Sequence, residues 1–293
     1  MTAASKISRH ISQVTGVPFE NVRQRSVGGG CINTTYVLSD DRRQFFVKTN
    51  QAALLDMFEA EFAGLNEITQ SNTIKAPHPV CFGEDGSQAY LVMEYLPTGG
   101  GDSQSALKLG QNLAAMHRVT QKDYGWFRDN TIGSTPQINQ PSDDWVSFWR
   151  DRRLAFQLEL AAKKGYRGRL QQKGELLLTK LESFFSQPPQ ASLLHGDLWS
   201  GNYAVTQSGE PVIFDPAVYY GDRETDLAMT ELFGGFPASF YAAYNEVYSL
   251  DEGYAVRKTL YNLYHIINHL NLFGGGYGSQ AERMIEHLLG EVS

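Results

Sequence analysis

The sequence is short of cysteine and lacks several motifs that mark common enzyme classes. Two cysteines among 293 residues cannot form a disulfide scaffold, so a reducing compartment and a cytoplasmic location are expected. No stretch approaches the roughly 18 uncharged apolar residues that a membrane span needs. Neither GxSxG nor GxxxxGK followed by Ser or Thr occurs, which argues against an α/β-hydrolase and a P-loop nucleotidase.

Basic charge is also scarce. The net charge is −7, and no block of about five like charges occurs, so neither nucleic acid nor a membrane is an expected partner. Apolar residues make up 42% of the chain, with 16 Phe, 15 Tyr and 4 Trp, which is enough for a large core. This length predicts two lobes or one large domain.

The first third of the chain has strand patterns separated by tight turns. Residues 53–69 have helical periodicity, and strands are expected over 22–26, 32–38, 44–49, 80–82 and 89–95. We therefore expect residues 1–96 to form a small antiparallel-sheet lobe with one main helix that binds the nucleotide.

A glycine-rich stretch at 97–101 is the clearest linker in the sequence. Beyond it helical periodicity dominates, with short strands near 204–205 and 212–214. Residues 97–293 should form a larger, mostly helical lobe that holds the catalytic loop and the acceptor site. The predicted fold is α+β and bilobal, and a cleft between two lobes is a common place for a small-molecule site.

The first 16 residues allow two interpretations. They are basic, contain serine and are amphipathic, as organelle transit peptides are. The pattern is also that of a first helix, with Ile7, Ile11 and Val14 on one face and Gly16 at its end. We favour the helix, because transit peptides are usually longer and richer in arginine.

The strongest chemical signal is the segment from His195 to Asn202, with the spacing His-x-Asp-x4-Asn. In that arrangement the aspartate, here Asp197, addresses an acceptor hydroxyl and the asparagine holds a metal. A short apolar strand then ends at Asp215, a second oxygen ligand for Mg²⁺. Either carboxylate alone could cap a loop, but the pair at this spacing predicts phosphoryl transfer from ATP.

Lys48 supports this prediction, because it ends an apolar strand as a phosphate-gripping lysine does. A buried lysine needs a counter-charge, for which we choose Glu61 over Glu59 on the next helix. A glycine cluster between the first two strands could let backbone N–H groups approach phosphates, although such clusters usually only make turns. The other predicted nucleotide contacts are therefore Gly28, Gly29, Gly30 and Cys31 of this cluster, and Glu94, Tyr95 and Leu96 beside the adenine.

These motifs together resemble the fructosamine kinase (ketosamine-3-kinase) family within the aminoglycoside phosphotransferase and protein-kinase-like superfamily. The matching segments are GGGCIN at 28–33, FFVK at 45–48, HGDLWSGN at 195–202, FDPAVYYGDRETDLAM at 214–229 and ELFGGF at 231–236. The resemblance implies a kinase-like fold and transfer of the γ-phosphate of ATP to the 3-hydroxyl of a fructosamine or ribulosamine. The phosphorylated adduct is unstable and releases the amine, which is protein deglycation.

The resemblance also implies residue roles. Asp197 would be the catalytic base, Asn202 and Asp215 the Mg²⁺ ligands, and Lys48 with Glu61 the phosphate-gripping pair. Asp226 and His195 would support the catalytic loop. Separately from the resemblance, aromatic rings can pack on a sugar, and we expect Trp199 and Tyr219 to lie near the acceptor, although aromatics at helical spacing are usually core.

Three points stay open on the residues alone. The same fold could phosphorylate another hydroxyl, such as that of an aminoglycoside, choline or a methylthioribose-like sugar, or the chain could be a non-catalytic pseudokinase. The sugar, the amine and a nucleotide other than ATP are not distinguished. A monomer is expected, and Cys31 is either inert or the site of a redox-linked dimer; equal alkylation of Cys31 with and without ATP would remove its link to the nucleotide.

Overall fold

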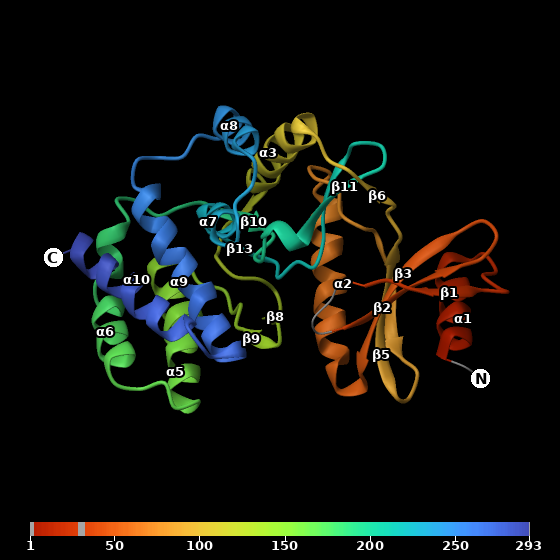
Figure 1. Ribbon diagram of the computed structural model, residues 1–293, viewed down its shortest axis with the longest axis horizontal. Coiled ribbons are helices and arrows are strands. Elements are labelled where there is room, and N and C mark those ends of the chain that lie inside the picture. The colour runs from red at the N-terminus through yellow and green to blue at the C-terminus, as the bar shows by residue number, and fades with distance from the viewer. Residues whose placement is uncertain (1–2, 29–32, 293) are drawn as a thin grey trace.

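The computed structural model describes residues 3–28 and 33–292, which form two lobes side by side (Figure 1). The smaller lobe contains a five-stranded antiparallel sheet of order β1-β2-β3-β5-β4. Its strands are β1 (Arg23–Ser26), β2 (Thr34–Ser39), β3 (Gln44–Gln51), β4 (Pro79–Glu84) and β5 (Gln88–Glu94). All five predicted strands are therefore confirmed, with bounds that differ by a few residues.

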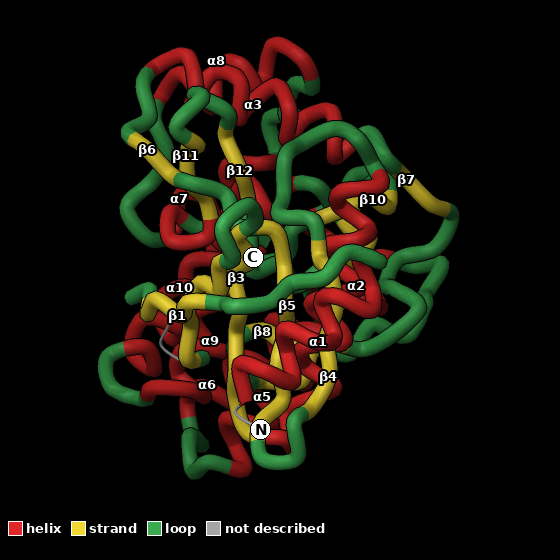
Figure 2. Tube along the Cα trace, turned by 90° about the vertical axis from the view of Figure 1, so that its right-hand side faces the viewer, coloured by secondary structure: helices red, strands yellow, loops and turns green. Residues whose placement is uncertain are grey.

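Two helices cover opposite faces of this sheet, α1 (Ala3–Thr15) on the outer face and α2 (Leu55–Gln70) on the face turned to the second lobe (Figure 1; Figure 2). The strand period of two explains this, since Tyr90 and Val92 of β5 join the cluster under α1 while Leu91 and Met93 join the main core under α2. A short 3₁₀ turn (Ala52–Leu54) precedes α2.

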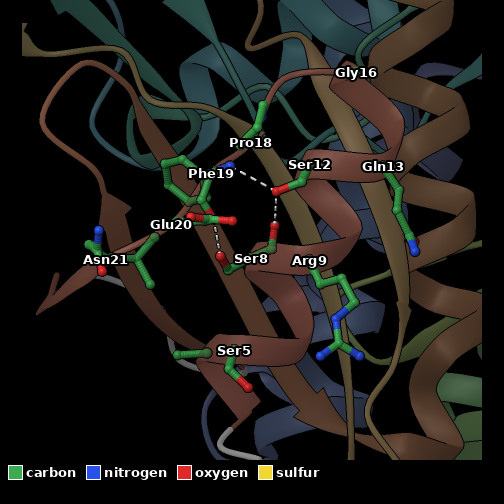
Figure 3. A pocket seen from close by; sticks show the side chains of 12 residues that line it. Ser5, Ser8, Arg9, Ser12, Gln13, Gly16, Pro18, Phe19, Glu20 and Asn21 are labelled. Atoms are coloured by element: carbon green, nitrogen blue, oxygen red, sulfur yellow. Dashed lines mark hydrogen bonds between the residues drawn. The ribbon is translucent and has the colours of Figure 1, made fainter.

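The first helix belongs to the folded lobe. Ile7 and Ile11 are buried in its core, and α1 ends at Gly16, which has φ +69°. Val14, predicted on the same face, is instead 53% exposed: it lies in the last turn of α1, after which the chain turns at Gly16 and buries Phe19 in the core of the lobe. Figure 3 shows how the turn is held: Ser12 Oγ accepts from the backbone N–H of Phe19 at 2.8 Å, and Ser8 Oγ donates to its carbonyl.

The larger lobe is mostly helical, as predicted. It contains α3 (Ser103–His117), α4 (Trp145–Trp149), a π-helical turn (Arg150–Ala155), α5 (Phe156–Lys163), α6 (Arg169–Leu178), a 3₁₀ turn (Leu181–Phe184), α7 (Glu224–Leu232), α8 (Ala238–Val247), α9 (Tyr254–Phe273) and α10 (Tyr277–Glu291). Helix α9 is buried along most of its length and anchors the lobe. Within the described residues, no helix combines the length and apolarity needed to cross a bilayer.

Short strands build three small sheets in this lobe and carry the site. One has the order β13-β10-β7, with β7 (Thr120–Gln121), β10 (Ala191–Leu194) and β13 (Tyr219–Gly221). Another pairs β11 (Tyr203–Thr206) with β12 (Pro211–Ile213) and with β6 (Thr98–Gly99), and a hairpin joins β8 (Asn130–Ile132) to β9 (Thr135–Gln137). The predicted linker thus contains a strand, β6, paired to the larger lobe.

Helix α2 is packed directly against the larger lobe. A Cβ on Gly64 would lie 3.1 Å from Val218 Cγ2, so a glycine here allows close approach. Tyr220 Oη donates to Glu67 at 2.7 Å, and Arg128 pairs with both Asp56 (2.7 Å) and Glu59 (3.1 Å). These contacts fix the helix relative to the segment that follows Asp215.

Candidate active site

One buried carboxylate holds the loop after β10 through hydrogen bonds. Asp226, in the first turn of α7, accepts from the backbone N–H groups of His195 (2.7 Å) and Gly196 (2.8 Å) and from the His117 ring (3.1 Å). Burial acts to raise the pKa of Asp226, but these hydrogen bonds and His117 outweigh it and hold the pKa below the usual range. The predicted support of this loop by Asp226 is present, and His117 is a partner that the sequence did not indicate.

Gly196 is required by the backbone of the loop. Its φ is +81°, and a Cβ there would lie 2.1 Å from the carbonyl oxygen of Ala217. The same neighbour fixes the loop from the other side, because the backbone N–H of Ala217 donates to the His195 carbonyl at 2.8 Å. The His195 loop and the segment after Asp215 are therefore locked together.

His195 is buried and links these two segments through its ring. The Asp197 backbone N–H donates to Nδ1 at 3.2 Å, which places the proton on Nε2, where it is donated to the Phe214 carbonyl at 2.9 Å. Burial lowers the pKa of His195, so the ring is neutral. It supports the loop and is not placed as a base.

Asp197 is oriented by Asn202. The Asn202 side-chain amide donates to the Asp197 carbonyl oxygen at 2.9 Å and to Asp197 Oδ2 at 3.1 Å. Burial and the nearby charge of Asp215 raise the pKa of Asp197 well above its usual range. A carboxylate with a raised pKa and a fixed orientation is suited to accept a proton from a hydroxyl.

Lys48 connects the two lobes. Its Nζ lies 2.5 Å from Glu61 Oε1 and 2.5 Å from Asp215 Oδ1, and its side chain is 5% exposed. Burial acts to lower the pKa of Lys48, but the two carboxylates outweigh it and raise the pKa. Of the two glutamates weighed for this contact, Glu61 is the partner, whereas Glu59 faces Arg128.

Asp215 and Asn202 have the donor chemistry that Mg²⁺ requires. Both offer side-chain oxygens, which Mg²⁺ prefers, and it usually takes few protein ligands together with phosphate and water. Asp215 adopts φ +58°, a left-handed conformation that Asp tolerates better than most residues, and its side chain is 45% exposed. These residues fit a Mg²⁺ ion bound together with nucleotide phosphates.

The remaining predicted nucleotide contacts lie where the sheet meets the second lobe. Glu94 ends β5 and accepts from the His78 backbone N–H, Tyr95 receives a hydrogen bond from Arg25, and all three of Glu94, Tyr95 and Leu96 are half-buried. Gly28 follows β1, and apart from its chain neighbours no described residue has a heavy atom within 4 Å of where its Cβ would be. The predicted residues Gly29, Gly30 and Cys31 lie outside the described residues.

The two predicted acceptor-side aromatics differ in placement. Trp199 is 37% exposed, with its ring against Gly201, where a Cβ would lie 2.3 Å from the indole. Tyr219 is buried, with the Arg153 guanidinium 4.2 Å from its ring centroid. Because strand β13 turns this side chain into the core, its ring has no face open to an acceptor, and that prediction is not supported by the geometry.

A two-lobed α+β fold with a buried lysine–glutamate pair, a metal-type aspartate and a His-Gly-Asp loop defines a kinase-like phosphotransferase. Comparison with known proteins identifies the family of phosphotransferases to which the chain belongs. The model of the fructosamine kinase family matches residues 3–291, and the chain belongs to that family.

Relatives and solved structures agree with this assignment. A probable ketoamine kinase of Synechocystis is 48% identical over 97% of this chain and 96% of its own, and the chloroplastic protein-ribulosamine 3-kinase of Arabidopsis thaliana is 45% identical over 90% and 82%. A crystal structure of a "putative fructosamine-3-kinase" from Haemophilus somnus has a TM-score of 0.88 at 28% identity, covering 97% of this chain and 96% of that one.

Proposed function

We propose that the protein is an ATP-dependent ketosamine kinase that phosphorylates the 3-hydroxyl of fructosamines or ribulosamines on glycated amines and so leads to deglycation. The observation that carries this is the convergence of Lys48, Asp197, Asn202 and Asp215 in one site of a chain 48% identical to a probable ketoamine kinase. A pseudokinase is disfavoured, since such proteins typically lack one of these groups.

In this proposal each group acts on a different part of the reaction. Lys48, fixed by Glu61, holds the nucleotide phosphates, and Asp197 orients the acceptor hydroxyl and takes its proton. A Mg²⁺ ion held by Asn202 and Asp215 would supply neutralisation of phosphate charge. Residues 1–96 form the nucleotide lobe, and residues 97–293 carry the catalytic loop and the acceptor site.

We further propose a cytoplasmic location, supported by the low cysteine content, and a monomer. The second cysteine, Cys81, is buried in β4, where burial raises its pKa to about 12, so it is an unreactive thiol. Of the two cysteines, only Cys31 is left as a candidate for a redox-linked dimer; the alternative is an inert thiol, and the alkylation comparison with and without ATP would distinguish the two.

The substrate is tested by ADP release from the purified protein with ATP and Mg²⁺. We expect turnover with fructoselysine or a ribulosamine, and none above background with choline, an aminoglycoside or no acceptor. Phosphorus NMR of the product should show a phosphate ester at the sugar 3-position. Turnover restricted to another acceptor would assign the protein to a different activity of the same fold.

Replacement of Asp215 by alanine should weaken the engagement of magnesium and nucleotide together. The change removes an oxygen ligand and one of the two carboxylates that face Lys48. We expect the Mg²⁺ concentration for half-maximal activity to rise about tenfold or more, since loss of a metal-site group commonly costs 10–100-fold. Calorimetric binding of ADP with and without Mg²⁺ gives an independent readout, because only binding with metal should weaken strongly. Full activity with unchanged magnesium dependence would remove Asp215 from the metal site.

A further inference from the structure

A line of aromatic rings runs from the catalytic loop to the outer edge of the larger lobe. The ring centroids of Trp199 and Phe233 are 6.3 Å apart, those of Phe233 and His269 are 4.8 Å apart, and His269 lies 5.5 Å from Phe273 and 5.2 Å from Tyr277. We call this set the aromatic strip: Trp199, Phe233, His269, Phe273 and Tyr277.

The strip is open to solvent at both ends. Trp199 is 37% exposed and Phe273 is 65% exposed, and both are among the few large hydrophobic side chains exposed in the described residues. These side chains come from the catalytic loop and the end of α9, which are far apart in sequence. Their alignment through shared ring contacts makes them one surface and not two isolated exposed residues.

Glycine turns border the strip on both sides. Gly234 and Gly235 follow Phe233, and Gly274 and Gly275 follow Phe273; all four have φ between +66° and +101°. At Gly234, Gly235 and Gly275, no heavy atom lies within 4 Å of where a Cβ would be. At Gly274 the Tyr166 hydroxyl lies 2.9 Å from that position, so the first turn is open and the second is covered by one side chain. The glycines themselves place no side chain next to the rings.

The groups near Asp197 have different roles and different exposure. Lys48, Glu61 and Asp215 occupy the nucleotide and metal side, and His195 with Asp226 is buried behind the loop. Trp199, two residues beyond Asp197, is exposed together with Ser200 and Gly201, and it is the aromatic residue of that exposed stretch. A sugar whose 3-hydroxyl meets Asp197 would have this ring, the first member of the strip, as a neighbour on the catalytic loop.

We propose that the aromatic strip binds the amine-bearing part of the acceptor, namely the lysyl chain and adjoining residues of a glycated peptide or protein. Aromatic faces suit this partner, because they pack on methylene chains and attract the protonated secondary amine through cation–π contacts. This inference rests on the proposed ketosamine kinase activity and adds to it the surface that would hold the amine side of the acceptor.

The test compares two acceptors in the full-length protein, a glycated heptapeptide with a central fructosyllysine and the small ketosamine fructosylglycine. With Phe273→Ala we expect KM for the heptapeptide to rise about five- to tenfold, with kcat unchanged and KM for fructosylglycine within about twofold. Phe127→Ala, which truncates a phenylalanine that is 72% exposed outside the strip, should change neither KM.

The other outcomes distinguish failure of the proposed amine-side site from failure of the proposed kinase activity. If KM for the heptapeptide is unchanged, or if KM rises equally for both acceptors, the strip does not bind the amine side of the acceptor. The proposed kinase activity would not be affected by that result. A concentration-dependent dimer that Phe273→Ala converts to a monomer would show that a second copy occupies the strip, and would also overturn it. Absence of turnover of either acceptor by the unmodified protein would overturn the proposed function and this inference together.

Discussion

Asp197→Asn should lower kcat by about 10²- to 10⁴-fold, the range expected for loss of a positioned general base. The amide keeps the size of the side chain and can still contact Asn202, which now donates to Asp197 Oδ2 at 3.1 Å. It cannot take a proton from the acceptor hydroxyl. Nucleotide affinity should change by less than about threefold, because Asp197 does not contact Lys48 and is not one of the two metal ligands.

The measurement pairs steady-state ADP release with a nucleotide titration of the same preparation. Asp41→Asn is a suitable control, since this aspartate lies in the β2–β3 turn and its side chain is 89% exposed. A variant at position 197 with kcat within tenfold of the unmodified protein would show that Asp197 only orients the acceptor. A parallel loss of nucleotide affinity would instead indicate a role in shaping the loop.

Asp226→Asn should damage the catalytic loop without touching either substrate. Asp226 accepts three hydrogen bonds, so the substituted amide must turn its NH₂ group toward at least one N–H donor of His195, Gly196 or His117. We expect kcat to fall about 100-fold and the free energy of unfolding to drop by about 2–3 kcal/mol, the cost typical of losing a buried hydrogen bond to a charged group.

Asp222→Asn separates these two effects. Asp222 is as buried as Asp226, accepts from the Glu224 backbone N–H at 3.0 Å and from Tyr261 Oη, and makes no contact with the catalytic loop. Burial raises the pKa of Asp222, whereas the pKa of Asp226 is held low, so Asp222→Asn should cost less stability than Asp226→Asn in thermal unfolding. It should lose little kcat in the folded protein. If the two variants lose activity to the same degree, the effect of Asp226 is a general loss of folding and not a positioning of the loop.

Much of the fold could be predicted, because strand and helix periods are strong in this sequence. The five strands of the small lobe and the helix that carries Glu61 follow from alternation, turn residues and a change to helical period. Short strands were harder: β6 consists of Thr98 and Gly99 within a stretch rich in glycine, and only its pairing with β11 makes it a strand. Local pattern does not encode such pairing.

The residues of the site could be predicted where the chemistry requires a fixed spacing along the chain. They were harder to predict where the orientation of a side chain depends on packing. The separation of Asp197, Asn202 and Asp215 along the chain is set by the loop and strand that carry them. The orientation of Tyr219 depends instead on which face of β13 meets the core and on the buried Arg153 stacked upon it. His117 ends an apolar helix face, and nothing in that pattern indicates that its ring reaches Asp226 across the lobe.

The packing of α2 has a consequence for how the activity is controlled. Glu61 cannot swing outward unless the close contact at Gly64 is broken, together with the bonds of α2 to Tyr220 and Arg128 of the larger lobe. The helix therefore holds Glu61 against the lysine, which in turn contacts Asp215 of the larger lobe. We expect constitutive turnover, which follows the supply of ATP and glycated acceptor and needs no activating modification of the protein.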